Sequence, residues 1–169
     1  MIKVGFSRHK GFAPLSWLIM LCERAPFSHA YIKIRAESLD RNLIYQATGS
    51  GVYFVGSVLF DQSAQVVEEY EIPISDDSRR KLLQWCVDNS GKSYGHLQLV
   101  GIGLMRLARL FGWKISNPFS NGNSAYVCCE LVAAALEDVG IAGPSDLDQV
   151  GLKETRDMVL RALDEKGKT

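Results

Sequence analysis

The chain has 169 residues, of which 47% are hydrophobic and 22% charged, and its 19 basic residues balance 19 acidic ones. A chain of this size and composition is expected to form a single domain, residues 1–169, that buries its core without disulfides or a structural metal. The balanced charge, with no clustered basic face, excludes the usual class of nucleic-acid-binding proteins, so no nucleic acid partner is expected.

The four cysteines are Cys22, Cys86, Cys128 and Cys129. They form no C-x-x-C pair, and no histidine lies at zinc-ligand spacing from them, so neither a metal nor a cofactor is predicted. Adjacent cysteines rarely bridge each other, so reduced thiols are expected. No secretory signal is recognised, and the apolar run 15–22 is too short to span a bilayer. The prediction is a cytoplasmic protein without a transmembrane segment; a virus-encoded or virion-associated protein would fit as well.

The first half of the chain has the pattern of a sheet with one helix inserted. Pro14 opens an apolar stretch that Pro26 ends, and proline is favoured in the first turn of a helix. The other segments alternate in polarity or are rich in β-branched residues, and the short links between them favour antiparallel pairing. Strands are predicted over residues 2–7, 28–35, 42–47, 52–55 and 65–74.

Helices dominate the second half, which makes the fold class α+β. Asp76 or Asp77 is expected to cap the first of them, and Gly140 is a fitting end for the third. The second is strongly apolar and is predicted to be a buried helix rather than a membrane span. The helices are expected over residues 76–89, 97–111, 124–140 and 152–163.

The helix predicted over residues 124–140 carries the strongest chemical signal. At about 100° per residue, Cys128 falls on the apolar side and Cys129 on a flank. The solvent side is expected to carry Glu130, Ala133 and Glu137. In the first turn, unpaired backbone N–H groups and the helix dipole lower a cysteine pKa and can hold an oxyanion. The alternative is a buried structural cysteine, one of the commonest core residues.

A thiolate nucleophile needs a general base, which is usually a histidine. His29 begins the alternating strand, which would hold its ring rigidly on one face with Tyr31 and Lys33. His9 lies in a polar turn and is expected to face water, and His96 is expected near the start of a helix. Each of the three is alternatively a solvated or hydrogen-bonded histidine without a catalytic role.

A third polar group commonly orients the imidazole. Gln46 lies on the strand predicted over residues 42–47, and pairing of that strand beside residues 28–35 would bring it next to His29. Glutamine adds no charge, so it stabilises an imidazolium less than a carboxylate would. The alternative is a polar residue on an edge strand.

Four segments together resemble the circularly permuted NlpC/P60 group of papain-like cysteine hydrolases, the branch of YiiX-like proteins and relatives of lecithin–retinol acyltransferase. Residues 27–34, FSHAYIKI, look like the family's Ser-His strand, and residues 45–52, YQATGSGV, like the segment that supplies the third polar residue. Residues 91–95, GKSYG, are similar to its Gly-x-x-Tyr-Gly element. Residues 126–132, YVCCELV, are similar to its Cys-Ser-Glu-Leu-Val nucleophile helix.

The resemblance implies a circularly permuted papain-like fold, in which an antiparallel half-barrel sheet packs against helices. It places Cys128 as nucleophile, His29 as base and Gln46 as the third residue, in the order of the permuted branch. Tyr94, Cys129 and Tyr126 are the implied substrate- or oxyanion-binding residues. The chain departs from the family twice: Gln46 replaces the commoner acidic residue, and Cys129 replaces serine.

The implied reaction is acyl transfer through an acyl-enzyme. The NlpC/P60 side of the family predicts an amidase or peptidase acting on peptides such as those of the bacterial cell wall, peptidoglycan. The permuted branch keeps open a lipid ester or thioester hydrolase or acyltransferase. The apolar segment 97–113, with Arg106, Arg109 and Lys114 at one end, would suit an acyl chain or peripheral contact with a membrane. A non-catalytic binding module on the same scaffold is a further alternative, and the oligomeric state stays open.

Overall fold

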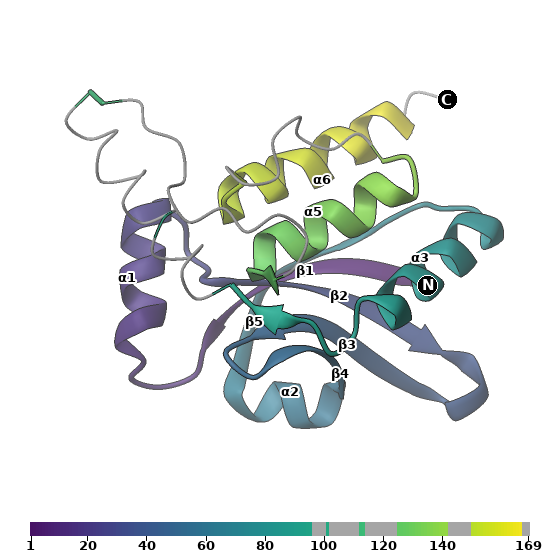
Figure 1. The fold of residues 1–169 in the computed structure, drawn as a ribbon, viewed down its shortest axis with the longest axis horizontal. Helices are drawn as coiled ribbons and strands as arrows, with labels where there is room; N and C mark the ends of the chain where they lie inside the picture. Colours follow the sequence, from purple (N-terminus) through teal and green to yellow (C-terminus); the bar gives the residue numbers. More distant parts are fainter. Residues whose placement is uncertain (96–100, 102–111, 114–124, 142–149, 167–169) are drawn as a thin grey trace.

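The computed structural model describes residues 1–95, 101, 112–113, 125–141 and 150–166. Its centre is a five-stranded antiparallel sheet in the order β4-β3-β2-β1-β5 (Figure 1). A second pair, β6 and β7, is parallel. The strands are β1 Ile2–His9, β2 His29–Ala36, β3 Arg41–Thr48, β4 Gly51–Gly56, β5 Ala64–Glu71, β6 Ser93–Tyr94 and β7 Ala125–Tyr126.

Helices cover both faces of this sheet. In Figure 1, α5 lies across one face with α6 outside it, and α2 lies against the other face. The α+β class and the antiparallel sheet packed with helices confirm the coarse prediction from sequence. The helices are α1 Pro14–Glu23, α2 Ser57–Ser63, α3 Asp76–Asp88, α5 Cys128–Asp138 and α6 Leu152–Lys166, with a short 3-10 turn at Glu37–Leu39.

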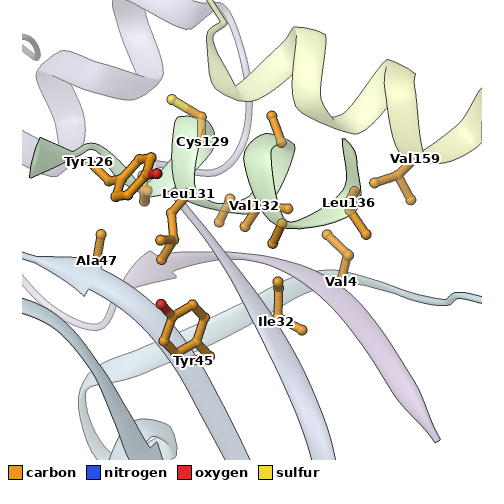
Figure 2. Close-up of a cluster of buried hydrophobic side chains, with 14 of the residues drawn as sticks. Val4, Ile32, Tyr45, Ala47, Tyr126, Cys129, Leu131, Val132, Leu136 and Val159 are labelled. Atoms are coloured by element: carbon orange, nitrogen blue, oxygen red, sulfur yellow. The ribbon is translucent and has the colours of Figure 1, made fainter. Parts of the chain in front are cut away.

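The main core fills the space between the sheet and α5 (Figure 2). Alternation along β2 sends Ala30, Ile32 and Ile34 toward this helix, where all three are buried. A smaller cluster on the opposite face joins Tyr31 and Ile44 to Phe60 of α2. Each face of the sheet therefore has its own apolar packing.

Several boundaries differ from the sequence-based prediction. Helix α5 begins at Cys128 rather than near Ser124, because Ala125 and Tyr126 form strand β7 instead. The cap of α3 is Ser75, whose hydroxyl accepts from the Ser78 N–H, rather than Asp76 or Asp77. Helix α2 was not predicted. His96 and the apolar segment 97–111, apart from residue 101, lie outside the described residues.

The predicted solvent side of α5 was wrong at its first turns. Glu130 and Ala133 are buried, while Glu137 is exposed as expected. Helix α6 packs along α5, and its residues Leu152, Met158 and Val159 belong to the same buried cluster as Ala133. A helical wheel shows which residues share a face, but it cannot show that a second helix will pack along it or that a carboxylate will be buried.

Within the described part of the chain, none of the helices combines the length and the apolar character needed to cross a membrane.

Candidate active site

His29 and Gln46 meet at one end of the sheet. His29 begins β2 and pairs with Ser7 of β1, and Gln46 lies on the neighbouring strand β3. The β2–β3 ladder ends at the pair Ile32–Tyr45, so Gln46 is a near-diagonal neighbour of His29 on the same face. The Nε2 atom of His29 lies 2.9 Å from Oε1 of Gln46. The predicted pairing of these two strands therefore brings the two side chains into hydrogen-bond contact.

This hydrogen bond selects the tautomer of His29. An amide oxygen only accepts, so Nε2 carries a proton and donates it to Gln46. The other nitrogen, Nδ1, is then the one left to exchange a proton with a nucleophile. The orientation resembles that of a base held by a third residue in an acyl-transfer triad.

Cys128 is the first residue of α5 and its sulfur contacts His29. A hydrogen bond from Cys129 lowers the pKa of Cys128, burial opposes this shift, and His29 and the backbone of Ala30 lower the pKa further. The net result is a Cys128 pKa well below its usual range. Burial alone would lower the pKa of His29, but its hydrogen bond and charge interaction with Cys128 and its bond to Gln46 raise it. The two shifts favour a thiolate–imidazolium pair.

The contact with Ala30 follows from the strand register. The pairing of β2 with β3 ends at Ile32, so the backbone of Ala30 lies beyond that ladder. It forms a hydrogen bond with the Cys128 sulfur instead. The sequence analysis did not identify Ala30, since a backbone donor leaves no signature in residue type.

The start of α5 offers further backbone donors. The first bond of the helix runs from the Leu131 N–H to the Val127 carbonyl at 3.0 Å, so the N–H groups of residues 128–130 precede the helical ladder. Glu130 Oε2 accepts from the Val127 N–H at 3.2 Å. This bond fixes the residue before Cys128 and gives the buried Glu130 carboxylate a hydrogen-bond donor in the first turn.

Cys129 turns its thiol toward α6. Its Sγ lies 3.2 Å from the carbonyl oxygen of Val150, and it also lies within hydrogen-bond reach of the Cys128 sulfur. A thiol has one proton, so it serves one acceptor at a time. The hydrogen bond to Cys128 together with burial raises the pKa of Cys129 well above its usual range. Of the adjacent cysteines, only Cys128 is therefore set up to ionise.

Tyr94 and Tyr126 are paired across β6 and β7 but face different surroundings. Tyr94 lines a cleft together with His29 and Gln46, and burial followed by the charges of Cys128, Cys129 and Glu130 raises its pKa. Tyr126 packs at 6.1 Å from the Trp85 ring and beneath the Lys92 ammonium, at 5.0 Å. It does not line the cleft, so a direct substrate contact for Tyr126 has no support in this arrangement.

The cleft has a volume of about 500 Å³. Cys128 does not line the cleft and keeps only 6% of its surface exposed, whereas His29, which contacts the sulfur, does line it. The exposed His9 lies at the cleft's rim. Apolar side chains come mainly from α1, β4 and α2 (Leu15, Ile19, Val55, Leu59, Phe60). The strands β1, β2 and β3 add polar groups that include Arg8, His29 and Gln46, and several hydroxyl groups complete the lining.

Tyr31 supports the imidazole from the same face of β2. The two rings are stacked with centroids 6.5 Å apart. The Tyr31 hydroxyl donates to Glu69 of β5 at 2.8 Å, so the side chain crosses β1, where the facing residue is Gly5. The alternating pattern placed His29 and Tyr31 on one face, but a sequence does not indicate which neighbour crosses a strand.

Among the described residues, no three His, Cys, Asp or Glu side chains gather closely enough to hold a metal ion. In the comparisons with known proteins, no protein-family model matches this chain and no curated protein matches it.

Proposed function

We propose that the protein is a cysteine hydrolase that works through an acyl-enzyme, with Cys128 as nucleophile, His29 as base and Gln46 as the orienting residue. The observation that carries the proposal is the chain of contacts from Cys128 through His29 to Gln46. A nucleophile, a base within reach of it and a third group that orients the base are the three parts such chemistry needs.

The proposed fold is the circularly permuted papain-like arrangement. Its support is the order of the elements: the histidine begins β2, the glutamine follows on β3, and the cysteine begins a helix near the end of the chain. That helix packs on β2 and β3, the two strands that carry the other members of the site.

The reaction would proceed in two balanced stages. The Cys128 thiolate attacks the substrate carbonyl, and backbone N–H groups at the start of α5, or that of Ala30, hold the oxyanion. The His29 imidazolium then gives its proton to the departing amine as the carbon–nitrogen bond breaks. In the second stage His29 takes a proton from water, the hydroxide attacks the thioester, and the thiolate is released with the acid.

An amide or peptide bond, such as one in a bacterial cell-wall peptide, is the first candidate for the substrate. A lipid ester or thioester is the second candidate. One observation favours it: Leu15, Ile19 and Leu59 line the cleft, and their apolar side chains would suit an apolar acyl group. Both kinds of substrate would react through a thioester on Cys128.

The decisive experiment pairs wild-type protein with Cys128→Ala. Each is incubated with cell-wall fragments, with acyl-thioester probes and with phospholipids, and products are identified by mass spectrometry. Release by wild type alone identifies the substrate class. The absence of release from every class would favour a binding module on the same scaffold.

Thiol labelling provides a test that needs no substrate. With a small reagent such as iodoacetamide near pH 6, Cys128 should be alkylated faster than Cys22, which is exposed, or Cys86, whose pKa burial raises to about 12. Equal and slow labelling of all three would contradict an activated nucleophile.

A further inference from the structure

Helix α1 carries its apolar residues on the outside. Pro14, Leu15, Trp17, Leu18, Leu21 and Cys22 occupy one continuous arc of roughly 160° when placed at 100° per residue. The opposite arc carries Ser16, which hydrogen-bonds Ser28 at 2.6 Å, and Glu23, which is buried. This is the reverse of a water-facing helix, whose polar side points outward.

The exposure of these side chains is large. We call the set Phe12, Leu15, Trp17, Leu18 and Leu21 the α1 surface; its exposed fractions are 88%, 58%, 63%, 56% and 75%. Single exposed apolar residues are ordinary, but five within ten residues of chain form a contiguous patch, which marks an interaction site.

The exposed charges of the segment that carries the α1 surface, residues 8–24, are all positive, and the one exposed acidic residue of the described chain that a hydrogen bond brings beside them is Asp61 of α2. Arg8, Lys10 and Arg24 are exposed at its two ends, and the only acidic residue from position 8 to 24 is the buried Glu23. Arg8 donates to the amide oxygen of Gln65 and Lys10 to the backbone carbonyl of Asp61, so both acceptors are neutral groups that do not cancel the positive charges.

We propose that the α1 surface, with these three cations, docks the protein on the surface of an anionic lipid bilayer. Leucine and tryptophan side chains flanked by arginine and lysine are what an interfacial helix needs, the apolar groups entering the acyl boundary and the cations meeting the headgroups. The charge pattern distinguishes a bilayer from a second copy of this chain, because two like-charged patches would repel.

Docking would also orient the cleft. Leu15 belongs to both the α1 surface and the cleft wall, and Leu59 of α2, which also lines the cleft, is exposed beside the exposed Val58. Apolar side chains therefore flank the cleft on both α1 and α2, and a protein resting on α1 would open its cleft toward the lipid. The proposal does not depend on hydrolysis, since binding can be measured with Cys128→Ala.

The test is co-sedimentation of full-length Cys128→Ala with vesicles of phosphatidylcholine alone and of an equal mixture with phosphatidylglycerol. Binding to the mixed vesicles should exceed binding to the neutral ones and should fall with added salt. The double variant Leu18→Gln/Leu21→Gln should lower the partition coefficient between water and the mixed vesicles by a factor of about ten or more. Lys10→Gln and Arg24→Asn should each lower it roughly fivefold.

Leu39→Gln and Val87→Gln are matched controls, because Leu39 and Val87 are about as exposed as Leu18 and Leu21 but lie outside the α1 surface. They should bind like the parent. Unchanged melting temperatures would show that all variants fold. Because Leu18 and Leu21 do not line the cleft, the Leu18→Gln/Leu21→Gln variant with Cys128 intact should still turn over a water-soluble substrate.

Three outcomes would overturn the proposal. The first is no binding, or equal binding by Leu18→Gln/Leu21→Gln. The second is a lipid-free dimer that this double variant dissociates, which would make a second copy the occupant. The third concerns the fluorescence of Trp17, measured as the difference between the parent protein and Trp17→Phe. If acrylamide cannot quench this fluorescence in the absence of lipid, the chain itself covers the α1 surface.

Discussion

The imidazole of His29 is held by the amide oxygen of Gln46, which lies on the adjacent strand and accepts the Nε2 proton at 2.9 Å. In the proposed site, Gln46 would perform with a neutral group the orienting role for which a carboxylate is more common. Because the bond raises the pKa of His29 without adding a charge, its removal should affect orientation more than electrostatics.

Gln46→Ala should therefore reduce the rate of Cys128 alkylation near neutral pH by about 10- to 100-fold, the range expected for losing a hydrogen bond to a charged group. Gln46→Glu should restore orientation and raise the pKa of His29 further. Both are checked by mass-spectrometric labelling rates. An alanine variant that labels at the wild-type rate would remove Gln46 from the site.

The pH dependence follows from the direction of the two pKa shifts. A lowered Cys128 pKa extends the thiolate to acidic pH, and a raised His29 pKa extends the imidazolium to more alkaline pH. Alkylation of Cys128 should thus begin at a pH well below that of an ordinary thiol. Turnover should fall as pH rises through the His29 pKa, since the proton for the leaving group is lost.

His29→Gln is the control for this profile. Without the imidazolium, the pH midpoint of Cys128 alkylation should move upward, while that of Cys22 should stay where it is. Identical midpoints for Cys128 in both proteins would show that the histidine does not activate the thiol.

Cys129 should act through its proton. Cys129→Ala removes the hydrogen bond that lowers the pKa of Cys128, so alkylation of Cys128 at acidic pH should slow by several-fold, about the effect of one neutral hydrogen bond. Cys129→Ser keeps a donor of similar size and should largely preserve the rate. Equal losses in the two variants would indicate a packing effect in place of a hydrogen bond.

Gly5 leaves room for the tyrosine that supports His29. A Cβ at this position would clash with the Tyr31 ring, so Gly5→Ala should lower the free energy of unfolding by about 1–3 kcal/mol and slow alkylation of Cys128. Gly56→Ala is a suitable control, because its added methyl would meet nothing within 4 Å. Chemical denaturation and labelling rates measure the two effects.

The local features of the site could be predicted from the sequence, and the long-range ones could not. Alternation in β2 and the short link to β3 were enough to place His29 and Gln46 on neighbouring strands. The same patterns do not reveal that β1 lies between β2 and β5, which puts Gly5 beneath Tyr31. Nor do they reveal that α6 packs along α5, or that Glu130 is buried, because both depend on how distant elements pack.

The short parallel pair β6–β7 fixes both ends of the connection formed by residues 95–124. The Gly95 N–H bonds the Tyr126 carbonyl at 3.0 Å, only two residues before Cys128. On the other side, Val52 of β4 exchanges backbone hydrogen bonds with Gly91 and Lys92, just before β6. A continuous line of backbone bonds therefore ties the residues before Cys128 to the edge of the sheet, and this tie depends on no side chain along it.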